Sequence, residues 1–240
     1  MKLTTVSFAA IAVLATSTVH AADLGDITAL ASNSSPVSSW DGFYVGAGVA
    51  GAMSKFNMDD KDCWYCASGT FTTGGLEFGG EAGFNIQSGS MVYGLAASAS
   101  TGSSVSTDVW WDDGHYEDSL NSLLAVRAKG GVAIDDSLLY ASIGVLAGNF
   151  SGRLDYEYNN QGINPTDSAV AEGMRMGVAI GAGWSKKLDE KLSINVSAEY
   201  QLFETVYAPM CPTIEEPCDI GEIGFGTERV VVQSGLAYHF

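Results

Sequence analysis

The sequence predicts an all-β fold in which eight antiparallel strands close into an up-and-down transmembrane β-barrel. Apolar residues recur at every second position in a series of segments, and this period is typical of strands. The connections between these segments are alternately short and long, which is typical of a membrane barrel with short periplasmic turns and long extracellular loops. The apolar faces carry no charged residue, as is expected where strands meet lipid.

The N-terminal segment is expected to be a secretory signal peptide over residues 1–21. Lys2 supplies its positive charge, a short apolar run follows, and Val19 and Ala21 are small residues suited to cleavage before Ala22. Residues 22–39 are rich in Ser and Ala without periodicity, which predicts a flexible periplasmic leader. The barrel domain is then expected over residues 40–240. No later apolar run approaches the ~18 residues of a membrane-spanning helix, so a membrane role falls to strands.

The first four expected strands show the alternation clearly. In residues 42–54, Phe, Val and Met alternate with Gly and Ala, and in residues 74–87 Leu, Phe and Ile alternate with Glu, Asn and Gln. In residues 91–101, Tyr and Leu alternate with Gly and Ser, and in residues 120–134 Leu and Val alternate with Arg and Lys. Each segment therefore has one apolar face and one small or polar face.

The last four expected strands differ in how clearly they define a face. Residues 138–150 are apolar on both faces, which leaves their facing open. In residues 174–185, Met, Val and Ile alternate with Arg and Gly, and in residues 192–202 apolar residues alternate with Ser, Asn, Glu and Gln. In residues 229–240, Val, Leu, Tyr and Phe form the apolar row, which ends on the last residue of the chain.

The lengths of the connections separate a membrane barrel from a soluble sandwich, because alternation alone is common to both. Three connections are short, namely residues 88–90, 135–137 and 188–191. Four are long, namely residues 55–73, 102–119, 151–173 and 204–228. A soluble sandwich has no reason to segregate its connections in this way, whereas a membrane barrel does.

Aromatic and charged residues support the same fold. Aromatic residues gather at the strand ends next to the short turns and the termini, as in the interfacial girdle of a membrane protein: Phe43, Phe84, Tyr93, Trp184 and Phe240. Strand charges occupy the opposite face, where an unpaired ion in a narrow lumen would be costly. We therefore expect the lumen acids to pair with the lumen bases: Glu77, Glu81 and Glu199 with Arg127, Lys129, Arg175 and Arg229.

Four cysteines, Cys63, Cys66, Cys211 and Cys218, fit an exported protein with structural disulfides. The spacing of the first two matches a redox motif, but no βαβ pattern surrounds it and nearby aspartates disfavour a thiolate. Metal binding is the other alternative. Local bridges, Cys63–Cys66 and Cys211–Cys218, are favoured because each pair is close in sequence, and a crosslink between the two loops remains open.

Composition limits the partners and the chemistry. The chain has 240 residues, of which 46% are hydrophobic and 16% charged. This charged fraction is below the ~25% of a typical soluble domain. The formal net charge of −17 would repel a phosphate backbone, so no nucleic acid is expected as a partner. With only three His, we predict no catalytic, cofactor-binding or metal-binding residues.

Both ends of the expected barrel carry a family resemblance. Residues 40–48, WDGFYVGAG, resemble the opening strand of the porin-like family of small eight-stranded outer-membrane β-barrel proteins. Residues 233–240, QSGLAYHF, resemble the C-terminal assembly signal of Gram-negative outer-membrane proteins, with alternating aromatics and a final Phe. The resemblance covers residues 40–240. It implies a cell outer-membrane location, contact with lipid and lipopolysaccharide, and insertion by the barrel-assembly machinery through the strand ending in Phe240, with both termini in the periplasm.

Eight strands enclose an interior that side chains fill, so we expect a structural or surface-interaction role and at most a narrow pore. The lumen charges are expected to form an ion-pair plug, with a narrow gated path as the alternative. Function then falls to the long loops. Two of them, within residues 108–118 and 204–228, are acidic and predict a solvated rim, with weak Ca²⁺ or Mg²⁺ association as the alternative.

Two further functions remain open as alternatives. One is surface binding of haem or a host molecule, known among relatives of this family, to which aromatic loop residues would contribute: His115, Tyr116, Tyr156 and Tyr158. The other is a lipid A-modifying enzyme, for which the resemblance to some small barrels requires His, Ser and a carboxylate near the outer leaflet. The only outer candidate is His115, on an expected loop, while His239 lies at the other end. We therefore predict that the chain is not an enzyme.

Overall fold

The structure is a computed structural model that describes residues 39–61, 68–102, 106–111, 114–157, 166–209, 211–212 and 222–240. Its strands are β1 (Gly42–Asp60), β2 (Ser68–Ser88), β3 (Met91–Gly102), β4 (Ser106–Trp111), β5 (Gly114–Ile134), β6 (Ser137–Glu157), β7 (Thr166–Lys187), β8 (Leu192–Phe203), β9 (Val206–Pro209), β10 (Cys211–Pro212) and β11 (Glu222–His239). Among these residues, no helix is long and apolar enough to span a membrane.

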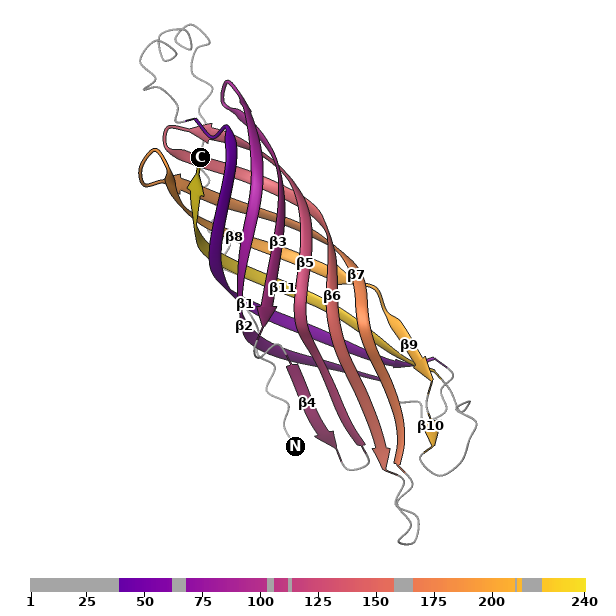
Figure 1. Cartoon of the computed structure of the whole chain (residues 1–240). Helices are drawn as coiled ribbons and strands as arrows, with labels where there is room; N and C mark the ends of the chain where they lie inside the picture. Colours follow the sequence, from indigo (N-terminus) through magenta and orange to yellow (C-terminus); the bar gives the residue numbers. More distant parts are fainter. Residues whose placement is uncertain are drawn as a thin grey trace, which may run out of the picture. The chain divides into compact units, whose positions relative to one another are not determined.

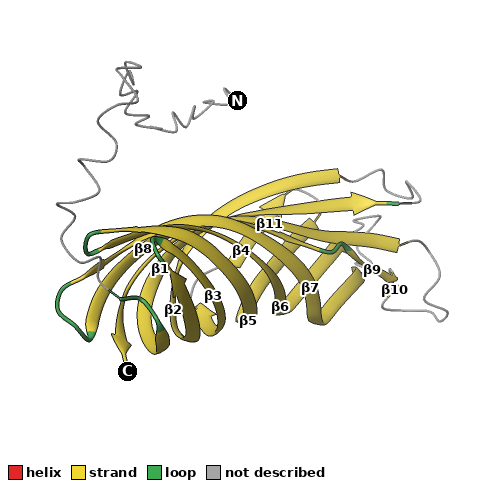
Figure 2. Ribbon diagram, turned by 90° about the horizontal axis from the view of Figure 1, so that it is seen from above, coloured by secondary structure: helices red, strands yellow, loops and turns green. Residues whose placement is uncertain are grey.

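Eight of the strands close into a ring. Antiparallel pairing runs in the order β1-β2-β3-β5-β6-β7-β8-β11, and β11 pairs back onto β1, for example at Val45 and Tyr238. Figure 1 and Figure 2 show these strands wrapping around a common axis. The three short strands are additions to the ring, since β4 pairs with β5, β9 with β11 and β10 with β7. The predicted eight-stranded up-and-down barrel is therefore confirmed.

One end of the barrel, which we call the turn end, carries the short connections. In the turns after β2 and β5, Gly89 and Asp135 have φ of 61° and 52°, the left-handed conformation that tight hairpins require. Phe240 lies at the same end, where its N–H donates to the Phe43 carbonyl at 3.0 Å. The opposite end, which we call the loop end, carries β4, β9 and β10 (Figure 1).

The outward face of the ring is an apolar belt, as the alternation predicts. On β1, Phe43 is 65% exposed and Val49 51%, while Ala50, which points into the lumen, is buried. The structure also decides the facing of β6, which the sequence left open, because Ile143 points outward and Leu146 is buried inside. On β1 the belt ends near Met53, close to the ~9–11 residues that a tilted strand needs to cross a bilayer.

The predicted aromatic girdle lies on the outside of the turn end. Its members are all exposed: Phe43, Phe84, Tyr93, Trp184 and Phe240. The rings of Phe43 and Phe84 lie 4.7 Å apart across β1 and β2, and those of Tyr238 and Phe240 lie 5.2 Å apart on β11. This arrangement suits the membrane interface, where aromatic rings are enriched.

The strands extend further into the expected long connections than the sequence predicts. β1 continues to Asp60 and β6 to Glu157, while β5 already begins at Gly114. In these extensions the polarity of the two faces is reversed, so that Lys55 is exposed and Phe56 is buried. The expected loop boundaries are wrong because a strand outside the membrane has polar residues facing water and apolar residues facing inward.

Beyond the belt the ring divides into two leaflets, because β3 ends at Gly102 and β8 ends at Phe203. One leaflet is the ladder β9-β11-β1-β2, and the other is β4-β5-β6-β7-β10. In the described part, no strand ladder joins the leaflets there. We call this region the head: residues 54–60, 68–76, 106–111, 114–122, 150–157, 166–175, 206–209, 211–212 and 222–229.

The predicted signal peptide, residues 1–21, and the predicted leader, residues 22–39, lie outside the described residues except for Ser39, as do Cys63, Cys66 and Cys218. The backbone of Cys211 belongs to β10, which pairs with Ser168 of β7. The pairing of the cysteines therefore stays a prediction.

Candidate functional site

The centre of the lumen is crossed by a buried ion pair between β5 and β8. Arg127 donates through Nε and Nη2 to the two carboxylate oxygens of Glu199, at 2.6 and 2.9 Å. Arg127 Nη1 also donates to Ser98 on β3 at 2.5 Å. Because the side chains are only 8% and 11% exposed, this two-point contact is the strong form of an ion pair.

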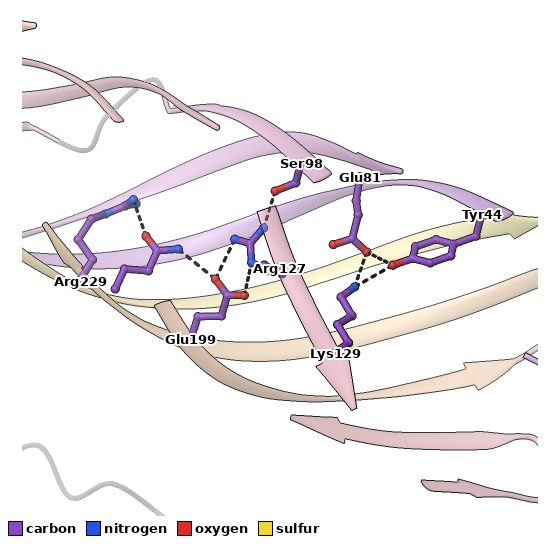
Figure 3. A network of polar contacts seen from close by, with 8 residues as sticks. Tyr44, Glu81, Ser98, Arg127, Lys129, Glu199 and Arg229 are labelled. Atoms are coloured by element: carbon purple, nitrogen blue, oxygen red, sulfur yellow. Dashed lines mark hydrogen bonds and ion pairs between the residues drawn. The ribbon is translucent and has the colours of Figure 1, made fainter. Parts of the chain in front are cut away.

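A second cluster lies on the turn-end side of this pair. Lys129 Nζ donates to Glu81 at 2.6 Å and to the Tyr44 hydroxyl at 3.0 Å, and that hydroxyl donates to Glu81 at 3.0 Å. Figure 3 shows the three side chains meeting from different strands. The lysine ammonium also lies 5.4 Å from the centroid of the Tyr140 ring, so the aromatic face adds to its stabilisation.

A third cluster surrounds the buried guanidinium of Arg229 on the loop-end side. It donates to Ser54 at 3.1 Å, to Gln201 at 3.0 Å and to Glu77. Gln201 Nε2 in turn donates to Glu199 at 3.1 Å, so this cluster connects to the central pair (Figure 3). The prediction that lumen acids pair with lumen bases is confirmed in these three clusters, and the partners are now defined.

Two small cavities lie on either side of the central pair. The larger, of about 60 Å³, is lined by Tyr44, Lys129 and other residues towards the turn end. The smaller, of about 30 Å³, is lined by Glu77 and Gln201 among others. Arg127 and Glu199 line both cavities and so lie between them. A few water molecules fit spaces of this size, since one water needs roughly 10–15 Å³ of cavity volume.

The turn end is filled by Trp40, which is 1% exposed and packs with Val92, Ala133 and Leu138. Its backbone N–H donates to Gln87 at 2.7 Å, and its indole lies edge-on to His239, with ring centroids 5.5 Å apart. The residue that opens the described barrel is therefore packed across its interior at this end.

The loop end is filled by aromatic side chains from both leaflets of the head and from the end of β8. Phe71 stacks on Tyr116 with ring centroids 4.8 Å apart, and Tyr116 stacks on Phe225 at 5.8 Å. Phe150 meets Phe203 edge-on at 4.9 Å. All but Phe71 are buried, so the leaflets are held together by a continuous apolar cluster.

Arg175 and Asp118 form a further ion pair inside this apolar cluster. Arg175 Nη1 donates to Asp118 Oδ2 at 3.2 Å, and its guanidinium lies 4.6 Å from the Phe150 ring. The expectation that Asp118 belongs to a solvated acidic rim is wrong, since this side chain is fully buried on the inward face of β5. The expectation that Arg175 pairs with Glu77, Glu81 or Glu199 is wrong, because its acidic partner is Asp118.

Burial raises the pKa of Asp118 to about 6, because the charged form loses the solvation of water. Arg175 and the hydroxyl of Tyr116 oppose this shift without cancelling it. Asp118 lies beyond the apolar belt, since the outward residues next to it on β5, Glu117 and Ser119, are polar.

Of the expected surface-binding residues, the structure describes the side chains of His115 and Tyr116, which lie at adjacent positions of β5 and therefore on opposite faces of it. Tyr116 is fully buried, so its expected place in an exposed loop is wrong. His115 lies on strand β5 instead of a loop, with Nδ1 3.7 Å from Asp155 Oδ2. The side chain of Tyr156 and the whole of Tyr158 lie outside what the structure describes, as do residues 213–221 of the second acidic segment.

A closed ring of strands with an apolar outer belt, an aromatic girdle and a filled polar lumen defines the class of integral membrane β-barrels. A family model described as outer membrane protein beta-barrel domain matches residues 8–240, and the chain belongs to this family. Its location is the cell outer membrane. The comparison with curated proteins finds no match.

Solved structures of other outer-membrane proteins are similar to this chain. Neisserial surface protein A is 12% identical, with coverage of 82% of this chain and 97% of its own and a TM-score of 0.39. The attachment invasion locus protein Ail of Yersinia pestis is 12% identical, over 81% of this chain and 98% of its own, with a TM-score of 0.33. A major outer membrane protein from Thermus thermophilus is 13% identical, over 82% and 99%, with a TM-score of 0.42.

Proposed function

We propose that this protein is a closed outer-membrane barrel with a structural or surface-interaction role, and that it does not serve as a diffusion pore. The observation that carries the proposal is that side chains block the lumen at three successive levels. Trp40 packs across the turn end, the Arg127–Glu199 pair separates two small cavities, and the aromatic cluster of the head fills the loop end. A solute would have to displace all three layers to cross.

Liposome swelling tests this proposal directly. Liposomes that contain the purified full-length protein should swell in a small sugar no faster than liposomes without protein. A general diffusion porin in the same lipid serves as the positive control. Swelling at a rate comparable to that of the porin would contradict a closed lumen.

A surface role is supported by the polar outer face of the head. Lys55 and Arg153 lie exposed beyond the belt, and Glu117 and Glu172 lie on the outward face of the second leaflet. In the orientation we propose, the turn end faces the periplasm and the head projects among lipopolysaccharide molecules on the cell surface. That the chain is not an enzyme stays a prediction.

We further propose that the C-terminal strand is recognised by the barrel-assembly machinery through Phe240. Its ring is 76% exposed on the lipid face, next to Tyr238, and its backbone closes the seam onto Phe43. Phe240→Ala should reduce the amount of folded barrel in the outer membrane several-fold, with unassembled protein in the periplasm. Val232→Ala, at the middle of the same exposed row, should assemble normally.

The two causes of such a loss can be separated. Purified Phe240→Ala should refold into detergent micelles as well as the wild type, because the ring makes few contacts with the rest of the barrel. Normal assembly of Phe240→Ala in cells would contradict the proposed recognition.

A further inference from the structure

Asp118 is placed in an unusual environment for a carboxylate. It lies on the inward face of β5 within the head, among Phe150, Phe225 and other apolar side chains. Its Oδ2 accepts hydrogen bonds from Arg175 and from the Tyr116 hydroxyl, each at 3.2 Å. Its Oδ1 is buried and makes no hydrogen bond with any described residue. An ionised carboxylate with an unsatisfied oxygen is costly in such surroundings.

The charged groups around Asp118 leave it a single basic partner. β7 contributes Arg175, whose other contacts are Thr227 of β11 at 3.5 Å and the carbonyl of Ala171 at 3.3 Å. The next inward residue of β11 is Arg229, which is bound to Glu77 of β2.

The other strands packed against Asp118 carry two further inward acids among the described residues: Glu77 of β2, which is bound to Arg229, and Asp60, the last residue of β1. In the head, β1 and β6 present apolar side chains to this region: Phe56, Met58, Phe150 and Leu154. On β5 itself, the neighbouring inward group that titrates is Tyr116, and burial raises the pKa of its hydroxyl. Asp118 is therefore the acid that contacts Tyr116 and Arg175 in the described head.

Arg175 and Tyr116 join this site to both leaflets. The guanidinium of Arg175 lies between the Phe150 ring at 4.6 Å and the Phe225 ring at 5.9 Å, which belong to opposite leaflets. Tyr116 stacks on Phe71 and Phe225 of the facing leaflet while its hydroxyl donates to Asp118. A change in the charge of Asp118 therefore acts on the contact between the leaflets.

We propose that Asp118 makes the head a proton-responsive plug, whose two leaflets pack more tightly when this carboxyl takes up a proton in mild acid. The neutral acid is cheaper to bury than the carboxylate, and it can donate a hydrogen bond of its own. This inference rests on the proposed closed barrel and adds the pH range in which the packing at its loop end is most stable.

The direction follows from proton linkage. The pKa of Asp118 is about 6 in the packed head, and its ordinary value of 3.8 applies when the leaflets separate and water reaches the carboxyl. The packed head therefore binds the proton more strongly, so packing becomes more favourable as the pH falls through about 6 and levels off near pH 4. Between pH 7.5 and pH 5, the equilibrium constant for local opening should fall about tenfold.

Hydrogen–deuterium exchange of the full-length barrel in detergent micelles tests the proposal at pH 7.5 and 5.0. After correction for the intrinsic pH dependence of exchange, peptides from residues 114–122 and 166–175 should open about tenfold less at pH 5.0. Peptides from the belt, such as residues 43–53, should not change. Equal opening of the head at both pH values, or greater opening in acid, would overturn the proposal.

Variants assign the response to this carboxyl. Asp118→Asn should abolish the pH dependence of head opening, so that the head is equally protected at both pH values, whereas Glu172→Gln, which removes an exposed carboxylate from the outer face of β7, should keep the wild-type response. If Asp118→Asn does not fold, the double variant Asp118→Leu with Arg175→Met replaces the pair by apolar side chains and should give a pH-independent, protected head. A response that persists in either folded variant would overturn the proposal.

The exchange measurement is independent of solute passage. A barrel that conducts in liposomes but shows the exchange response would reject the closed lumen and retain the proton-responsive head. A barrel that does not conduct and shows no response would reject only the inference about Asp118.

Discussion

At the scale of single residues, the three described charge clusters of the lumen match each buried base with an acid and with further hydrogen bonds. Arg127 illustrates the requirement, since three of its donors are satisfied by Glu199 and Ser98. Leaving such a group in a narrow lumen without its partner costs several kcal/mol. The lumen pairs therefore stabilise the fold mainly because they avoid the free-energy cost of unpaired buried charges.

The first prediction follows from this penalty. Glu199→Ala should destabilise the barrel by about 3–5 kcal/mol, because it leaves the Arg127 guanidinium buried without a counterion. Glu172→Ala removes an exposed carboxylate and should change stability by less than about 0.5 kcal/mol. The unfolding midpoint in urea, followed on the full-length protein in detergent micelles, measures both. Equal midpoints for the two variants would show that Glu199 does not have the buried role described.

The sequence predicts that the lumen charges face inward but does not assign their partners. Strand parity alone puts Glu199 and Arg127 inside, because side chains alternate between the two faces. The pairing itself depends on the relative shift of strands that lie 72 residues apart in the chain, and local sequence does not encode that shift. The burial of Asp118 could not be predicted for another reason. It lies in a segment rich in acidic residues, and such a segment is normally exposed to solvent.

At the scale of single strands, the reversal of polarity along β1 marks where the membrane ends. Within the belt Val49 faces outward and Ala50 inward, whereas beyond it Lys55 faces outward and Phe56 inward. Side chains still alternate between the two faces, but the apolar residues change from odd-numbered to even-numbered positions of β1. A search for a single apolar row therefore stops at the membrane boundary and mistakes the rest of the strand for a loop.

Glycines inside the ring provide the second prediction. The ring of Tyr44 lies over Gly83 on the neighbouring strand, at the place where a Cβ atom would be. Gly83→Ala should displace this ring from its hydrogen bond with Glu81 and destabilise the barrel by about 1–3 kcal/mol. Gly51→Ala is the matched control, because a methyl group there meets no atom within 4 Å and points to lipid.

Urea unfolding midpoints of Gly83→Ala and Gly51→Ala test this predicted difference in stability. The Gly51→Ala barrel should be as stable as the wild type or slightly more stable, since alanine restricts the unfolded chain. A Gly83→Ala barrel of unchanged stability would mean that the Tyr44 ring does not occupy the space above Gly83.

At the scale of the whole molecule, the alternation of short and long connections was enough to predict the closed ring, because a membrane leaves no stable open sheet edge. The division of the head into two leaflets was not predictable in the same way. It depends on β3 and β8 ending early at Gly102 and Phe203, where no proline or charge run announces the end. The strands of the two leaflets continue beyond these ends because they bury the aromatic cluster between them.

Closure of the ring leads to the last prediction, which concerns migration on a denaturing gel. Every strand of the ring pairs on both sides through long ladders, and β1 and β11 pair from Tyr44 to Asp60. Detergent at room temperature cannot open such a ring strand by strand, since each exposed backbone group would lose its partner. The unheated protein should therefore migrate as a compact form, at a different position from the boiled protein. Identical migration before and after boiling would contradict a closed barrel, whereas the Glu199→Ala variant should lose its compact band at a lower temperature than the wild type.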